Sequence, residues 1–294
     1  MSQVEATGVV TSRAAGRRPQ TAAGFLALFR SELLLTFRRV RTVVLLGILA
    51  VLPVLIGVVV KIETDGPSRG EGPAFIAQVT QNGLFLVFTA LAVSLPVFLP
   101  MAVGVVAGDS VAGESAGGTL RYLLVAPAGR TRLLAAKFTA GLAFCLAATL
   151  TVALAALATG AALFPMGEVT LVSGETIGVG PALLRAVLVA VVVAASLSGL
   201  VAIGLFISTL TGSGIAAMAA TVGLVITVQI LDSFPQLHAV QPFLFAHHWL
   251  SFGDLLREPI YWDDVLKNLG LQGAYVAVFG SAAWSRFTSR DITA

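Results

Sequence analysis

The stretch GDSVAGESAGGTLRYLLVAPAGRTRLLAAKF, residues 108–138, is a polar island between two long apolar segments. It carries six charged side chains: Asp109, Glu114, Arg121, Arg130, Arg132 and Lys137. Charge is scarce elsewhere, since 57% of the 294 residues are hydrophobic and 11% are charged, against about 25% charged residues in an ordinary soluble domain. Lipid is therefore the expected solvent, and the island is expected to connect two membrane spans.

Six apolar runs are long enough to cross about 30 Å of hydrocarbon as helices that rise about 1.5 Å per residue. They lie near residues 42–60, 84–107, 133–164, 182–209, 214–231 and 269–284. A lipid-facing backbone must satisfy its hydrogen bonds within helices or a closed barrel, and continuous rather than alternating runs favour helices. The sequence therefore predicts an all-α polytopic membrane protein with six transmembrane helices.

Basic residues gather on one side of this six-span arrangement, which marks that side as cytoplasmic. It holds thirteen of the eighteen Lys and Arg residues: Arg13, Arg17, Arg18, Arg30, Arg38, Arg39, Arg41, Arg121, Arg130, Arg132, Lys137, Arg286 and Arg290. The other side holds Lys61, Arg69, Arg185, Arg257 and Lys267, with most of the acidic residues. We therefore expect a multi-pass protein of the cytoplasmic membrane, with the island and both termini in the cytoplasm.

Composition divides the chain further. Residues 1–23 are expected to form a flexible basic cytoplasmic tail. Residues 24–41 interleave apolar and charged residues at helical spacing, as in an amphipathic helix lying in the inner membrane interface; a cytosolic extension of the first span is the alternative. Residues 42–294 would form the six-helix transmembrane domain. Within it, residues 232–268 are rich in aromatic residues and prolines, which predicts short helices that form a hairpin in the outer leaflet.

The island itself has the features of an ordered helix. Gly113, Gly117 and Gly118 predict a kinked start, and Thr119 can cap a helix. Leucines follow at helical spacing from Leu120 until Pro127 ends the element. A compact helix of this kind at the inner face of the membrane is suited to docking a soluble partner. The alternative is an ordinary positively charged loop that only sets the topology.

The order of residues in the island resembles the cytoplasmic loop of ABC transporter permeases of the ABC type-2 export family. In that loop an acidic opening with Gly-Glu, a Gly-Thr-Leu step, a Leu-Leu pair, a proline and a basic end recur in this order, as they do in residues 108–138. The six-span layout, the amphipathic helix and the aromatic outer segment are also similar to that family. The resemblance thus covers most of the chain from Phe25 onward.

This resemblance implies a membrane half-transporter that pairs with a second copy or a close relative and binds two cytosolic ATPase subunits. By matching positions, the ATPase-coupling element would consist of Gly113, Glu114, Gly118, Thr119, Leu120, Arg121 and Leu124. The interfacial helix, a second ATPase contact in the family, would contain Arg30, Glu32, Arg38 and Arg39. The chain has no Walker lysine loop, so we expect a non-catalytic subunit without a cofactor, whose ATPase partner binds ATP and Mg.

The predicted spans carry no charged residue at mid-depth, which argues against a proton relay or an antiporter. This favours export of a hydrophobic or amphipathic cargo such as a drug (multidrug efflux), an antibiotic, a lipid or a lipid-linked compound. Two alternatives remain open: a membrane anchor or sensor subunit of an ATPase complex, and an ion-efflux permease. The basic residues lie beside spans rather than on a soluble module, so we expect no nucleic-acid partner.

Smaller motifs allow further expectations. Gly104 and Gly108 form a GxxxG pair that predicts close helix packing, although glycine is common in membrane helices. Three prolines could kink their spans: Pro53, Pro96 and Pro100. His247 and His248 lie near Asp254, but adjacent histidines point different ways on a helix and no third ligand has a metal-site spacing. We therefore expect no metal site.

Overall fold

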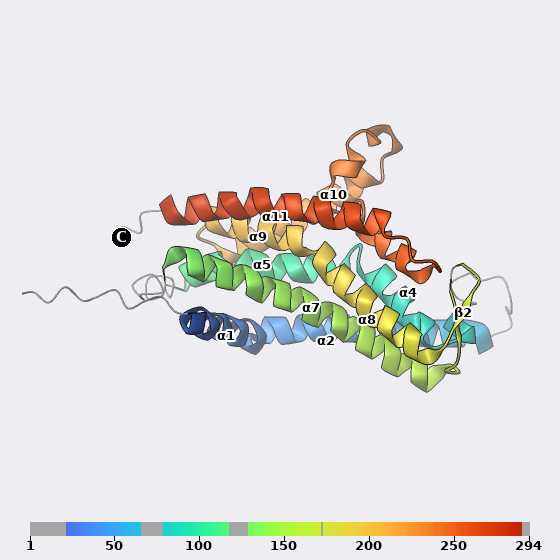
Figure 1. Cartoon of the computed structure of the whole chain (residues 1–294). Coiled ribbons are helices and arrows are strands. Elements are labelled where there is room, and N and C mark those ends of the chain that lie inside the picture. The colour runs from blue at the N-terminus through green and yellow to red at the C-terminus, as the bar shows by residue number, and fades with distance from the viewer. Residues whose placement is uncertain (1–21, 66–78, 118–128, 172, 290–294) are drawn as a thin grey trace, which may run out of the picture.

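The apolar runs form long helices that lie side by side in a bundle (Figure 1). The computed structural model describes residues 22–65, 79–117, 129–171 and 173–289. Its longer helices, in chain order, are α1 (Ala22–Arg38), α2 (Val40–Asp65), α4 (Phe85–Ser94), α5 (Phe98–Ala116), α7 (Arg130–Leu163), α8 (Val179–Ser196), α9 (Ser198–Leu210), α10 (Gly214–Asp232) and α11 (Asp263–Ser289).

Among the described residues, four helical segments are long and apolar enough to cross a membrane, and the bent pair α4–α5 makes a fifth. The four are α2, α7, α8 together with α9, and α10. These five segments begin within three residues of five of the predicted spans. The remaining prediction, residues 269–284, falls in α11, which is less apolar than the others, so a sixth span stays a prediction.

The end of the bundle that holds α1 also holds the end of α5, the start of α7 and the end of α11 (Figure 1). Two hydrogen bonds join α7 to α11 here. Arg130 donates to the carbonyl oxygen of Thr288 at 2.7 Å, and the indole of Trp284 donates to the hydroxyl of Thr131 at 3.0 Å. The described parts of the chain on either side of residues 118–128 therefore lie close to α1 and to the end of α11.

The second predicted span is bent by 55° between α4 and α5. Pro96 lies in this break and has no N–H to continue a helix. Its carbonyl oxygen accepts a hydrogen bond from Nε2 of Gln229 on α10, at 2.8 Å, so the backbone group is satisfied inside the bundle. The predicted kink at Pro96 is confirmed, whereas Pro53 lies inside α2 without a break.

The fourth predicted span is interrupted directly after Ser196, between α8 and α9. The Ser196 carbonyl oxygen accepts the indole N–H of Trp249 at 2.9 Å, and its hydroxyl accepts from Nδ2 of Asn268 at 2.6 Å. Gln272, one turn further along α11, donates to the carbonyl oxygen of Phe245 at 2.8 Å. These polar groups of α11 are buried and hydrogen-bonded within the bundle.

The segment between α10 and α11 differs from the predicted helical hairpin. It forms three short 3₁₀ helices, η1 (Pro235–Leu237), η2 (Gln241–Phe243) and η3 (Trp249–Leu256). Prolines in the first turns of η1 and η2 cannot donate the hydrogen bonds that an α-helix running through them would need. The prediction of short helices is confirmed, whereas the single helical hairpin is corrected to three 3₁₀ helices. η3 packs against α8 and α11, while part of the segment projects from the long helices in Figure 1.

The all-α prediction also missed a small antiparallel sheet between α7 and α8. Strand β1 (Val169–Thr170) pairs with β2 (Thr176–Ile177), with Val169 opposite Ile177. The sheet lies at the end of the bundle opposite α1 (Figure 1). The side chain of Asn82 donates to the carbonyl oxygens of Gly167 and Glu168 at 2.9 and 2.8 Å, which ties the sheet to the turn before α4.

Helices α5 and α10 approach each other closely along the predicted GxxxG pair. A Cβ atom added to Gly108 would lie 2.9 Å from the carbonyl oxygen of Ala217 and from the Cα of Met218. At Gly104 the corresponding atom would touch the methyl group of Thr221 at 3.4 Å. The prediction of close helix packing is confirmed, because only a glycine permits this approach at residue 108.

Candidate functional site

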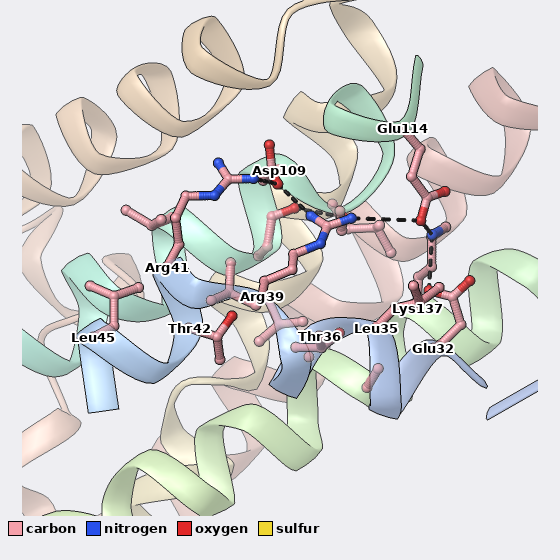
Figure 2. Close-up of a pocket in the computed structure, with 18 residues that line it drawn as sticks. Glu32, Leu35, Thr36, Arg39, Arg41, Thr42, Leu45, Asp109, Glu114 and Lys137 are labelled. Carbon is pink, nitrogen blue, oxygen red and sulfur yellow. Dashed lines mark hydrogen bonds and ion pairs between the residues drawn. The ribbon is translucent and has the colours of Figure 1, made fainter. Parts of the chain in front are cut away.

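Six charged side chains converge at the α1 end of the bundle and line a shared pocket (Figure 2). We call them the ionic cluster: Glu32 on α1, Arg39 between α1 and α2, Arg41 on α2, Asp109 and Glu114 on α5, and Lys137 on α7. Three are basic and three acidic, so the cluster is formally neutral. It joins segments that are far apart in the sequence.

Lys137 is the most deeply buried member, with 2% of its side chain exposed. Its Nζ lies 3.0 Å from Oε2 of Glu32 and 2.6 Å from Oε1 of Glu114. Both carboxylates are themselves buried. Because opposite charges are needed to hold an ammonium group in such surroundings, the two carboxylates together compensate Lys137. The result is a bridge from α1 through α7 to α5.

The second half of the cluster is centred on Asp109. Its Oδ2 accepts hydrogen bonds from Nη1 of Arg39 and from Nη2 of Arg41, each at 2.5 Å. Arg39 also reaches toward Glu114, with Nη2 4.0 Å from Oε1, so it links the two halves. Asp109 is buried, whereas Arg41 is half-exposed at the edge of the pocket. The start of α2 is thereby fastened to α5.

Two glycines make room for the Asp109 carboxylate. A Cβ atom added to Gly113 would lie 2.5 Å from Oδ1 of Asp109, and one added to Gly214, the first residue of α10, would lie 2.4 Å from the same oxygen. Any larger residue at either position would displace the carboxylate from its arginines. Gly113 therefore serves close approach, and the predicted kink there is wrong, since α5 continues through it to Ala116.

The predicted site residues lie in different surroundings in the structure. Glu114, assigned by resemblance to the coupling element, is buried in the ionic cluster. On the interfacial helix, Arg30 and Arg38 are exposed, whereas Glu32 is buried and points into the bundle. Five positions of the coupling element lie outside the described residues: Gly118, Thr119, Leu120, Arg121 and Leu124. Their role stays a prediction.

The sequence placed Asp109 and Lys137 in the polar island and indicated no partner for either. A usable signal was present, because the basic cytoplasmic side of the chain contains the acidic residues Glu32, Asp109 and Glu114 next to apolar runs. Acidic residues at such positions are compensated when they are buried. Which basic residue meets which acid depends on tertiary contacts and could not be read from spacing.

His247 and His248 form a separate polar contact. Nδ1 of His247 lies 2.6 Å from Oδ1 of Asp232 at the end of α10, and the rings of His247 and His248 meet edge to face with centroids 4.8 Å apart. Asp232 is thus the partner of His247. Within the described ranges, no group of three or more metal-binding side chains is present.

His248 provides a pH prediction. Burial, followed by the charge of the neighbouring His247, lowers the pKa of His248. The folded protein then binds fewer protons than the unfolded chain, so this residue makes stability fall as the pH drops through about 6.5, the ordinary pKa of histidine. We expect His248→Gln to reduce the acid-induced loss of thermal stability, and His238→Gln, at an exposed histidine, to leave it unchanged. Equal acid sensitivity of His248→Gln and the natural chain would contradict this assignment.

Residues 26–248 match the family model of the ABC-2 family transporter proteins. The chain belongs to the ABC-2 transporter family. The match begins in α1 and ends directly before η3, so it includes the whole ionic cluster and the residues between α5 and α7. No curated protein matches the chain.

The protein is therefore an integral membrane transport subunit, the permease of an ABC transporter. Membership of the ABC-2 family implies association with ABC ATPase partners. The resemblance seen in the sequence of the island is thus confirmed at the level of the family. Three members of the ionic cluster, Asp109, Glu114 and Lys137, lie on α5 and α7, the two helices that flank the predicted coupling segment.

Proposed function

We propose that this ABC-2 permease is the membrane half of an ATP-driven exporter for a hydrophobic or amphipathic molecule, such as a drug, an antibiotic, a lipid or a lipid-linked compound. It would act in the cytoplasmic membrane with both termini in the cytoplasm. A second copy or a close relative would complete the permease. Two ATPase subunits would bind ATP and Mg, while this chain would be non-catalytic and would hold no cofactor.

The observation that carries the proposal is the bridge centred on Lys137. The proposed coupling segment around Leu120 connects α5, which ends at Ala116, with α7, which begins at Arg130. Both helices are tied to each other through Glu114 and Lys137, and Lys137 is tied to α1 through Glu32. Displacement of the coupling segment would therefore move three helices together, since ion-pair networks and rigid helices can carry coupling between distant sites.

Transport also needs a difference between two states. Closure of the ATPases on ATP would favour one arrangement of the bundle over another only if the two arrangements bind the closed ATPases with different affinities. The ionic cluster would transmit such a difference, because its buried ion pairs join α1, α5 and α7. The bent α4–α5 pair and the interrupted α8–α9 pair are suited to change angle between such arrangements.

The distribution of buried charge supports an apolar or amphipathic cargo. In the described part of the chain, the buried charged residues are Glu32, Asp109, Glu114 and Lys137, all in the ionic cluster. The other buried polar side chains are those of Ser, Thr, Asn and Gln. A pathway for an inorganic ion would need compensating charges or polar groups along the spans, so the ion-efflux alternative has less support.

The test is purification of the tagged, full-length protein from its native cells in mild detergent, followed by mass spectrometry and an ATPase assay. We expect a soluble ABC ATPase in equal amounts, with hydrolysis stimulated by cargo. Leu120→Asp should reduce recovery of the ATPase about tenfold, equivalent to about 1.4 kcal/mol of binding free energy, whereas Leu120→Met should not. Recovery of the ATPase with no stimulation by any tested hydrophobic compound would favour the anchor or sensor role. Recovery of the permease alone would contradict the proposal.

A further inference from the structure

Helix α1 has two faces of different chemistry. Its inner face packs against α7 and α2, with Phe37 meeting Phe144 at a ring-centroid distance of 6.3 Å. Its outer face carries Leu26, Arg30, Leu34 and Arg38, all exposed. These four residues are spaced four positions apart, so they follow one another along a single stripe of the helix.

The ionic cluster decides the charge of this outer stripe. Glu32 is the only acidic residue of α1, and its side chain is turned inward to Lys137 at 3.0 Å. Arg30 and Arg38 have no acidic partner among the described residues. Pairing of Glu32 inside the bundle therefore leaves the outer face of α1 with positive charge alone.

The same stripe exposes large apolar side chains. Leu26 is 67% exposed and Leu34 is 47% exposed, and Leu35 beside the stripe is 48% exposed. Leucines and arginines in alternation suit the boundary between lipid headgroups and acyl chains, where apolar side chains enter the hydrocarbon and the guanidinium groups stay at the phosphates. An acidic protein surface would neutralise the arginines but would leave such exposed leucines in less suitable surroundings.

We propose that the outer face of α1 binds anionic phospholipids of the inner leaflet through Arg30 and Arg38. Each arginine at such a surface contributes roughly a fivefold preference for anionic lipid, and the preference falls with added salt because the charges are screened. Bound lipid would hold α1 in the interface and would leave Glu32 facing Lys137. The inference does not depend on the identity of the cargo.

The experiment places a fluorophore on α1 of the full-length protein. Ser31→Cys provides an exposed position beside the stripe, and Cys145→Ala removes the one native cysteine, which is buried. The labelled protein is placed in phosphatidylcholine nanodiscs that contain the same small fraction of either brominated phosphatidylglycerol or brominated phosphatidylcholine. We expect stronger quenching by the brominated phosphatidylglycerol, and a smaller difference at high salt.

The Arg30→Gln, Arg38→Gln double variant should abolish this difference. Arg257→Gln is the matched control, since it removes an exposed arginine paired with Asp254 at 3.3 Å, outside α1. Equal quenching by the two brominated lipids in the protein with both arginines would overturn the proposal. So would a double variant that keeps the lipid preference but loses the ATPase during purification, because the stripe would then bind the ATPase instead.

Discussion

Replacing Lys137 by Met is expected to lower the free energy of unfolding by about 3–5 kcal/mol, because it leaves two buried carboxylates without their shared cation. Glu32 and Glu114 both depend on Lys137, and both are buried. Methionine fills a similar volume, so the loss is electrostatic rather than a cavity effect. The measurement is the temperature at which the detergent-solubilised protein loses its monodisperse size-exclusion peak.

The control for this experiment is Lys267→Met. Lys267 forms a similar contact with Asp264 at 2.7 Å, but both side chains are exposed, and surface ion pairs contribute little. We expect that variant to unfold at the temperature of the natural chain. Combining Lys137→Met with Glu32→Gln and Glu114→Gln should recover much of the lost stability, since neither buried carboxylate is then left without its cation. If Lys137→Met and Lys267→Met behaved alike, the buried bridge would not stabilise the fold.

The positions of five spans could be predicted from the sequence because long continuous apolar runs determine them almost alone. The bend at Pro96 was also foreseeable, since proline lacks the N–H that a helix needs. The end of the second span could not be predicted from the sequence. Asp109 and Glu114 suggested that the helix stops before residue 108, yet α5 continues to Ala116. It can do so because Arg39, Arg41 and Lys137 compensate these acids from other helices.

The ionic cluster illustrates the same limit for the candidate site. Glu32 and Lys137 are 105 positions apart, and no local pattern relates them. The helix period does place Glu32 off the stripe formed by Arg30 and Arg38, but it does not say which face is buried. That depends on how α1 packs against α7. Family membership identifies the chain as a permease subunit. The contact between Glu32 and Lys137 shows how α1 and α7 are connected within it.

A second close backbone approach, in addition to that between α5 and α10, joins the end of α7 to the turn before α4. A Cβ atom added to Gly160 would lie 2.1 Å from the carbonyl oxygen of Gly83, and one added to Gly83 would lie 2.4 Å from the carbonyl oxygen of Gly160. The neighbouring N–H of Gly83 donates to the carbonyl oxygen of Pro165 at 3.0 Å. The end of α7 is thereby locked to the turn that begins α4, and neither backbone can yield cheaply.

Gly160→Ala is therefore expected to destabilise the protein by about 1–3 kcal/mol, the usual cost of overpacking, although alanine favours a helix more than glycine does. Gly223→Ala on α10 is the matched control, because a Cβ atom there would meet no atom within 4 Å. That variant should be unchanged or slightly more stable, since alanine restricts the unfolded chain. The two variants add the same methyl group to a helix, so comparing their unfolding temperatures isolates the contact with Gly83. Equal temperatures would mean that the turn before α4 can move away from α7, and the two would then not form a rigid unit at this end of the bundle.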